Sequence, residues 1–164
     1  MSKSLLFTDG SANPQTQVGF GAYLLLQKDN IFCPASLQNI QTKKFEHTSS
    51  TKLELETLLW AFKEIDIKLF PVLVYTDCQN ILSLMSRREK FEQNNYKSKT
   101  GKEIKNHLLY KEFYIFTDLH KCEFSKIKGH KKKEFKDEID KVFSLVDKTA
   151  RNALRENTLQ ESHL

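Results

Sequence analysis

The sequence predicts an α/β domain in which short buried strands alternate with amphipathic helices. Two short apolar runs rich in β-forming residues, 5–8 and 72–76, are each followed by an aspartate, Asp9 and Asp77. Between them, apolar residues recur at helical spacing over 55–65. Ligands of α/β folds gather at the carboxyl ends of strands, so both aspartates are candidate site residues.

Length and composition favour a single domain. The chain has 164 residues with 39% hydrophobic content, enough for one core. We expect a folded domain over residues 1–155 and a polar tail over 156–164. No apolar run approaches the roughly 20 residues of a membrane span, and no signal core begins the chain. We therefore expect a cytoplasmic protein without membrane contact, and we take a monomer as the default, since the sequence carries no signal for its oligomeric state. The 3 cysteines lack a CxxC pair, which favours reduced thiols over disulfides or zinc.

The first quarter of the chain predicts antiparallel strands. The pair Asn13-Pro14 marks a turn after the first strand. We place this turn over residues 10–14. Gly19 and Gly21 fall on one face of the second strand, where another element can pack closely. The predicted strands span 5–8, 18–27 and part of 31–47.

The clearest helix follows the third predicted strand. Ser49, Ser50 and Thr51 are candidate caps, and the apolar face continues until the segment ends before Pro71. Glu54 borders that apolar face, whereas Glu56 looks toward a wetter one. No Lys or Arg lies three or four residues after Glu54. A buried carboxylate without a basic partner is costly, so a bound cation is expected there.

The second half of the chain alternates strands and helices. Its last helix begins near Glu134 or Ile139 and ends at Leu154, and Asp147 falls on its apolar face and projects inward. The elements predicted before it are a strand over 72–76, a short helix over 79–85, a helix over 102–116 and a strand over 122–127.

The formal net charge of the whole chain is +5, and the positive charge is concentrated in one stretch. Residues 87–136 carry 15 Lys and Arg against 7 Asp and Glu, and KIKGHKKK places five lysines in eight residues. Such density is typical of phosphate contacts, although a solvated basic surface is the alternative. Beside a carboxylate cluster, the cations favour a polyanionic substrate.

Five short motifs in order resemble type 1 ribonuclease H. They are Thr8-Asp9-Gly10-Ser11 with Asn13-Pro14, Lys52-Leu53-Glu54-Leu55, Thr76-Asp77-Cys78-Gln79, Lys128-Gly129-His130, and Val146-Asp147-Lys148-Thr149-Ala150-Arg151. The resemblance covers nearly the whole chain. It implies a ribonuclease H-like fold, a five-stranded mixed sheet flanked by helices, with the catalytic domain over 1–155. It also implies an endonuclease that hydrolyses the RNA strand of RNA/DNA hybrids, giving 5′-phosphate and 3′-hydroxyl ends.

The carboxylates suit two-metal-ion catalysis. Two Mg²⁺ ions, with Mn²⁺ as a substitute, need hard oxygen ligands. As a hypothesis, Asp9 bridges the ions, Glu54 and Asp77 hold one, and Asp147 holds the other. His130 resembles the family histidine that assists proton movement or product departure; the alternative is a surface histidine in a basic loop.

The resemblance also implies substrate-binding residues. Asn13 and Gln79 match minor-groove positions, where the 2′-hydroxyl distinguishes RNA from DNA. The phosphate site for the DNA strand is matched by Ser49, Ser50 and Thr51, although relatives often have amides there. The family's basic protrusion is matched by a segment that starts with Arg87, Arg88 and Lys90 and lacks its tryptophans.

Residue counting and motif disagree about the fourth carboxylate. In many relatives the last aspartate follows the loop histidine by about ten residues, which selects Asp140, whereas the motif selects Asp147. On one helix Asp140 and Asp147 lie about 10 Å apart, so they cannot both bind the same two metal ions. We favour Asp147 for its motif and apolar neighbours.

Two other functions remain open. A non-catalytic module that binds RNA/DNA hybrids or double-stranded RNA would share the fold and the basic surface, but it would not need four carboxylates. A DNA-cleaving member of the superfamily, such as a transposase or junction resolvase, would use a similar acidic cluster. The short chain and the pair Asn13 and Gln79 favour the hybrid.

Overall fold

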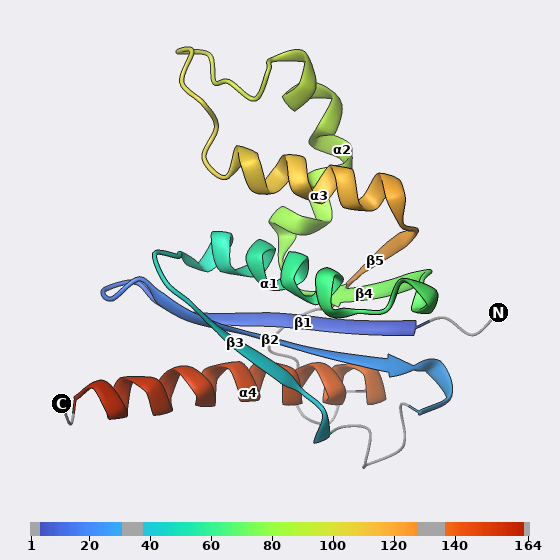
Figure 1. Cartoon of the computed structure of the whole chain (residues 1–164), viewed down its shortest axis with the longest axis vertical. Helices are drawn as coiled ribbons and strands as arrows, with labels where there is room; N and C mark the ends of the chain where they lie inside the picture. Colours follow the sequence, from blue (N-terminus) through green and yellow to red (C-terminus); the bar gives the residue numbers. More distant parts are fainter. Residues whose placement is uncertain (1–3, 31–37, 128–136, 163–164) are drawn as a thin grey trace.

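A five-stranded mixed sheet organises the chain, with helices on both faces (Figure 1). The computed structural model describes residues 4–30, 38–127 and 137–162. The strand order is β3-β2-β1-β4-β5; β1 pairs antiparallel with β2, β2 antiparallel with β3, and the other pairs are parallel. The bounds are β1 Ser4–Asn13, β2 Val18–Gln27, β3 Gln41–Phe45, β4 Val72–Thr76 and β5 Cys122–Lys126. The predicted α/β class and five-stranded mixed sheet are confirmed.

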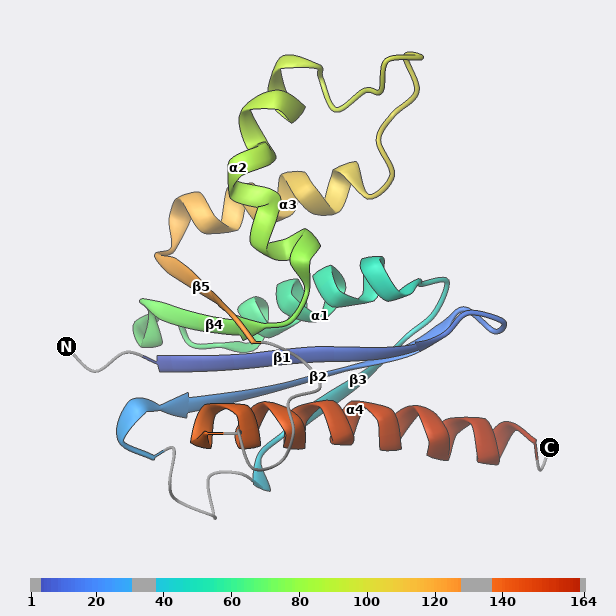
Figure 2. The ribbon, with the colours of Figure 1, turned by 180° about the vertical axis from the view of Figure 1, so that it is seen from behind.

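Two layers of helices lie on one side of the sheet and a single long helix on the other. In both views α1 covers one face, α2 and α3 stack beyond it, and α4 covers the opposite face (Figures 1 and 2). The helices are α1 Ser50–Glu64, α2 Gln79–Gln93, α3 His107–Leu119 and α4 Glu138–Glu161, with short 3-10 turns η1 Lys28–Asn30 and η3 Ile67–Leu69. Among the described helices, none combines the length and apolarity needed to cross a bilayer.

Alternation along β1 builds two separate cores. Leu6 packs with the α1 and α3 side chains, whereas Leu5 and Phe7 pack with Val146 and other residues of α4. Successive side chains of a strand point to opposite faces, so Asp9 continues the row of Leu5 and Phe7. The Asp9 carboxylate therefore lies on the face of β1 that packs against α4, at the seam between these two elements.

The first strand is longer than the sequence predicts. Residues 10–13, expected to form a turn, continue β1, because Gly10 pairs with Gly21 and Asn13 with Val18 in an unbroken ladder. Asp9 is therefore inside β1. It still lies just beyond the parallel ladder with β4, whose last pair is Phe7 with Tyr75.

Three helices also differ from their predicted bounds. The expected basic loop after residue 85 is helical to Gln93, because Phe91 is buried and stacks on Tyr110 with ring centroids 5.3 Å apart. The third helix starts at His107 instead of residue 102. The last helix runs through the expected polar tail to Glu161.

Glycines let α1 approach the sheet closely. A Cβ atom on Gly21 would lie 2.1 Å from Thr57 Oγ1, and one on Gly19 would lie 2.6 Å from Leu53 Cδ2. The close packing predicted at these two glycines is confirmed. Because Glu54 follows Leu53, this contact presses the glutamate against the sheet.

We predict that Gly21→Ala destabilises the protein by about 1–3 kcal/mol, since the added methyl group overpacks the contact with Thr57. Urea unfolding measures the change. Thr57→Ala combined with Gly21→Ala should recover part of the loss, as expected for residues in contact. A neutral Gly21→Ala would contradict the tight packing.

Candidate metal centre

Three carboxylates from three elements converge at the end of the parallel ladder. One ligand oxygen from each of Asp9, Glu54 and Asp77 lies within 4.8 Å of the others. Asp9 comes from β1, Glu54 from the second turn of α1, and Asp77 directly follows β4. Asp9 is 4% exposed and Glu54 9%, whereas Asp77 is exposed. The cluster is thus buried on one side and open to solvent on the other.

Burial and mutual repulsion oppose ionisation of this cluster. Burial is the main cause that raises the pKa of Asp9, and the negative charge of Glu54 adds to it. Burial likewise raises the pKa of Glu54, with a further contribution from Asp77. Hydrogen bonds to Glu54 from the Asp9 side chain and from the Gly10 backbone N–H lower this pKa, but they offset only part of the increase. The fully charged cluster therefore needs a positive partner.

The residues present fit a divalent cation. Glu54 Oε2 is buried without a hydrogen-bond partner. No ion pair joins Asp9 or Glu54 to a Lys or Arg within the described ranges. Clustered carboxylate oxygens are the ligands that Mg²⁺ and Mn²⁺ favour. A cation held by Asp9, Glu54 and Asp77 would satisfy the orphaned oxygen and relieve the repulsion.

The two aspartates of α4 have different surroundings. The Asp147 carboxyl lies within hydrogen-bond reach of Asp9, and its Oδ2 is 3.0 Å from Arg151 Nη2. Asp140 instead takes part in a capping box at the start of α4. Its N–H donates to Asp137 Oδ1 (2.8 Å), and its Oδ2 accepts from the Asp137 N–H (3.2 Å). Of the two, Asp147 borders the carboxylate cluster.

The predicted phosphate-binding hydroxyls lie at the start of the helix that carries Glu54. Ser49 is the N-cap of α1, and its Oγ accepts the N–H of Lys52 (3.3 Å). Ser50 and Thr51 follow in the first turn and are exposed. All three hydroxyl groups thus lie within about one and a half turns of Glu54.

The two predicted minor-groove residues lie on different elements, Asn13 on β1 and Gln79 on α2. Asn13 ends β1, and its Oδ1 accepts the N–H of Gln15 (2.9 Å). Gln79 is exposed at the start of α2, two residues after Asp77, and its Oε1 accepts from Lys126 Nζ (3.4 Å).

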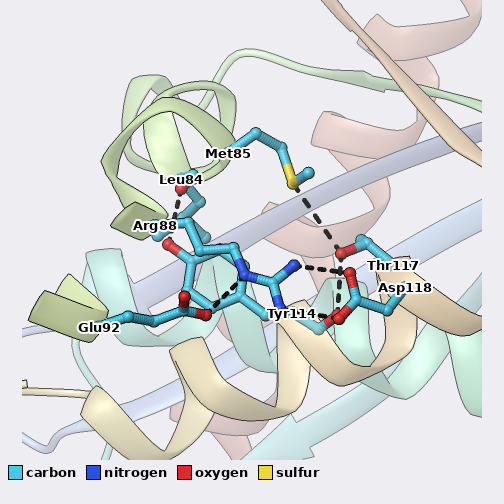
Figure 3. A network of polar contacts seen from close by, with 7 residues as sticks. All are labelled: Leu84, Met85, Arg88, Glu92, Tyr114, Thr117 and Asp118. Atoms are coloured by element: carbon cyan, nitrogen blue, oxygen red, sulfur yellow. Dashed lines mark hydrogen bonds and ion pairs between the residues drawn. The ribbon is translucent and has the colours of Figure 1, made fainter. Parts of the chain in front are cut away.

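Arg88 joins α2 to α3 (Figure 3). Its Nη1 and Nη2 atoms donate to the two carboxylate oxygens of Asp118 at 2.6 and 2.7 Å, and its Nε donates to Glu92 at 2.7 Å. Its guanidinium carbon lies 5.0 Å from the centre of the Tyr114 ring. The Tyr114 hydroxyl donates to the Leu84 carbonyl at 2.6 Å. The donors of Arg88 are therefore engaged within the protein.

The neighbouring cations of α2 are arranged differently. Arg87 donates from Nη1 to Asn80 Oδ1 at 2.7 Å and lies over the Phe91 ring at 4.8 Å. Lys90 is exposed. His130 and the other residues of 128–136 lie outside the described residues.

The family model for RNase H matches residues 1–155. The chain belongs to the RNase H family. It is 25% identical over 158 residues to a ribonuclease H of Caldicellulosiruptor saccharolyticus, covering 95% of this chain and 99% of that protein. It is 28% identical over 153 residues to one of Acetivibrio thermocellus, covering 87% and 92%. The chain is accordingly an RNase H family enzyme.

Solved structures share the fold of this RNase H family chain. A foamy viral protease-reverse transcriptase in complex with dsDNA has a TM-score of 0.62 at 15% identity, over 90% of this chain and 96% of that chain. One in complex with an RNA/DNA hybrid has a TM-score of 0.66 at 14% identity, over 92% of this chain and 20% of that one. At such identities the likeness concerns the fold alone.

Two cations near the RNase H carboxylates were not among the predicted site residues. Arg151 could have been found from its spacing, four residues after Asp147 on one helix. Lys126 reaches Gln79 across 47 residues, a contact without a local signal in the sequence.

We predict that Asp9→Asn stabilises the metal-free protein by more than about 1 kcal/mol at pH 8. In the folded chain Asp9 and Glu54 keep protons that the unfolded chain loses above about pH 4, so the stability of the metal-free protein falls as pH rises from there. Asparagine removes one of these groups, and its advantage should shrink toward pH 4. Urea unfolding in EDTA measures this.

Glu156→Gln provides the control for that comparison, because it removes an exposed carboxylate of α4. It should change stability by less than about 0.5 kcal/mol. An Asp9→Asn protein less stable than the unmodified one at pH 8 in EDTA would contradict the predicted repulsion.

Proposed function

We propose that the chain is an endonuclease that hydrolyses the RNA strand of RNA/DNA hybrids and leaves 5′-phosphate and 3′-hydroxyl ends. The convergence of Asp9, Glu54 and Asp77, two of them buried and with Glu54 Oε2 unpartnered, carries this proposal. Membership of the RNase H family supports it. A binding module would gain nothing from such repulsion.

The proposed cofactors are two Mg²⁺ ions, with Mn²⁺ as a substitute. Asp9 would contribute a ligand to both ions, Glu54 and Asp77 would hold one of them, and Asp147 would hold the other. Bound there, the ions would activate water for attack on the phosphodiester and stabilise charge on the leaving 3′ oxygen. The proximity of Asp147 to Asp9 supports its choice over Asp140, whose carboxylate caps α4.

The protein contributes preorganisation. Leu53 is buried against the glycines of β1 and β2, so the backbone that carries Glu54 is held by packing before any ion binds. Arg151 orients the Asp147 carboxylate through their 3.0 Å ion pair. We propose that His130 assists proton movement or product departure.

Substrate recognition is proposed along the rim of the cluster. Asn13 and Gln79 would read the minor groove, and Glu54 would accept a hydrogen bond from a 2′-hydroxyl. The DNA-strand phosphate is assigned to Ser49, Ser50 and Thr51.

The cations of α2 are proposed to contact the backbone of the hybrid. Arg87 and Lys90 would do so directly, whereas Arg88, whose donors face Asp118 and Glu92, would hold α2 against α3. The three carboxylates of the convergent cluster belong to one chain, and we propose that the chain acts as a monomer. We propose that this action takes place in the cytoplasm.

We predict that labelled RNA/DNA hybrid is cut in its RNA strand with Mg²⁺ or Mn²⁺ and is intact in EDTA, while duplex RNA, duplex DNA and single strands are spared. Asp147→Asn should lower the rate about 100-fold or more, because it removes a charged ligand worth several kcal/mol. Asp140→Asn should keep its activity and lose about 1 kcal/mol of stability through the weakened cap.

Binding of hybrid without cleavage would favour a non-catalytic module, and cleavage of duplex DNA would favour a DNA nuclease of the same superfamily. An active Asp147→Asn beside an inactive Asp140→Asn would reverse the choice of the fourth carboxylate.

A further inference from the structure

A cleft of about 360 Å³ opens between the ends of β1 and α4. Ser11 and Asn13 line it from the strand. Arg151, Arg155 and Thr158 line it from the helix, and Leu154 and Leu159 provide apolar surface. Most of these helical residues lie at or beyond Leu154, where the sequence predicts that the helix ends. The cleft thus has a mainly apolar lining, with two arginines and several polar groups around it.

This cleft continues the row of catalytic candidates. Two residues of a strand advance about 6.7 Å and four residues of a helix about 6 Å, so positions on the two elements stay in step. The matched positions are Asp9, Ser11 and Asn13 on β1 and Asp147, Arg151 and Arg155 on α4. A nucleic-acid strand that reaches the carboxylate cluster along the seam between β1 and α4 therefore passes into the cleft.

The charge along the seam changes sign. Next to Asp9 the helix presents Asp147, whose charge is shared with Arg151 at 3.0 Å. One turn farther, Arg155 is exposed and forms no ion pair with any residue of the described ranges. Arg155 thus offers its full charge to a ligand in the cleft, and phosphate is the anion that a neighbouring nuclease site would bring there.

One exposed ion pair links the end of α4 to the sheet. Lys44 Nζ of β3 lies 3.7 Å from Glu161 Oε1 in the last turn of α4, and 3.6 Å from Glu46 Oε1. The contact ties the helix end to the edge of the sheet. Arg155 lies between this tie and the buried part of the helix at Ala150.

We propose that the cleft binds a backbone phosphate of the substrate strand within a few nucleotides of the scissile bond, with Arg155 as its main cationic contact. The proposal rests on the proposed hybrid nuclease function. A contact outside the reacting phosphate is made equally in the ground state and the transition state, so it raises affinity without accelerating the chemical step.

The test compares Arg155→Gln with Lys68→Gln in the full chain. Lys68 is an exposed lysine of η3, near the amino end of β4 and thus at the opposite end of the sheet from Asn13. With Mg²⁺ and hybrid, Arg155→Gln should raise KM about 3- to 10-fold and leave kcat within about two-fold. Its plot of log(kcat/KM) against log salt should be shallower by about one. Arg155→Lys should retain most of the affinity.

The control Lys68→Gln should behave like the unmodified protein. An equal KM for the two glutamine variants, or a loss of kcat without a change in KM, would overturn the cleft as a phosphate site. Fluorescence anisotropy with hybrid in EDTA gives a second readout, in which Arg155→Gln should bind about 3- to 10-fold more weakly than Lys68→Gln. If the unmodified protein cuts no hybrid, the nuclease proposal fails, while the anisotropy comparison still decides on the cleft.

Discussion

The contact of α1 with the glycines of β1 and β2 is the constraint on which the site depends. Gly21 and Gly19 leave room for Thr57 and Leu53, and Glu54 is thereby carried to Asp9. A side chain at either glycine would push the helix away. The glycines thus contribute to the chemistry without touching a ligand, because they set the distance between two carboxylates.

That arrangement works against the stability of the metal-free protein. Asp9 and Glu54 are buried beside each other, and both have raised pKa values because burial, together with the charges of neighbouring carboxylates, disfavours their charged forms. Two apolar cores, one on each face of the sheet, hold the chain folded against this repulsion. A divalent cation that binds only the folded protein would offset the repulsion and stabilise the fold.

Local patterns in the sequence predicted much of this fold and part of the site. The strands at 18–27 and 72–76 were predicted at their observed bounds, since both segments are rich in apolar and aromatic residues. The extension of β1 was missed because Gly10 and its neighbours resemble a turn until their partners on β2 are known. The engagement of Arg88 by Asp118 was hidden for a similar reason, since the two lie 30 residues apart.

The cation requirement of the carboxylate cluster is tested most directly by calorimetry of Mn²⁺ binding in buffers of different ionisation enthalpy. Because Asp9 and Glu54 hold protons in the metal-free fold, we predict that Mn²⁺ binding at pH 7 releases protons, and that Asp9→Asn weakens binding and reduces this release. Binding without proton release, or binding unchanged by Asp9→Asn, would contradict a metal centre built on these buried carboxylates.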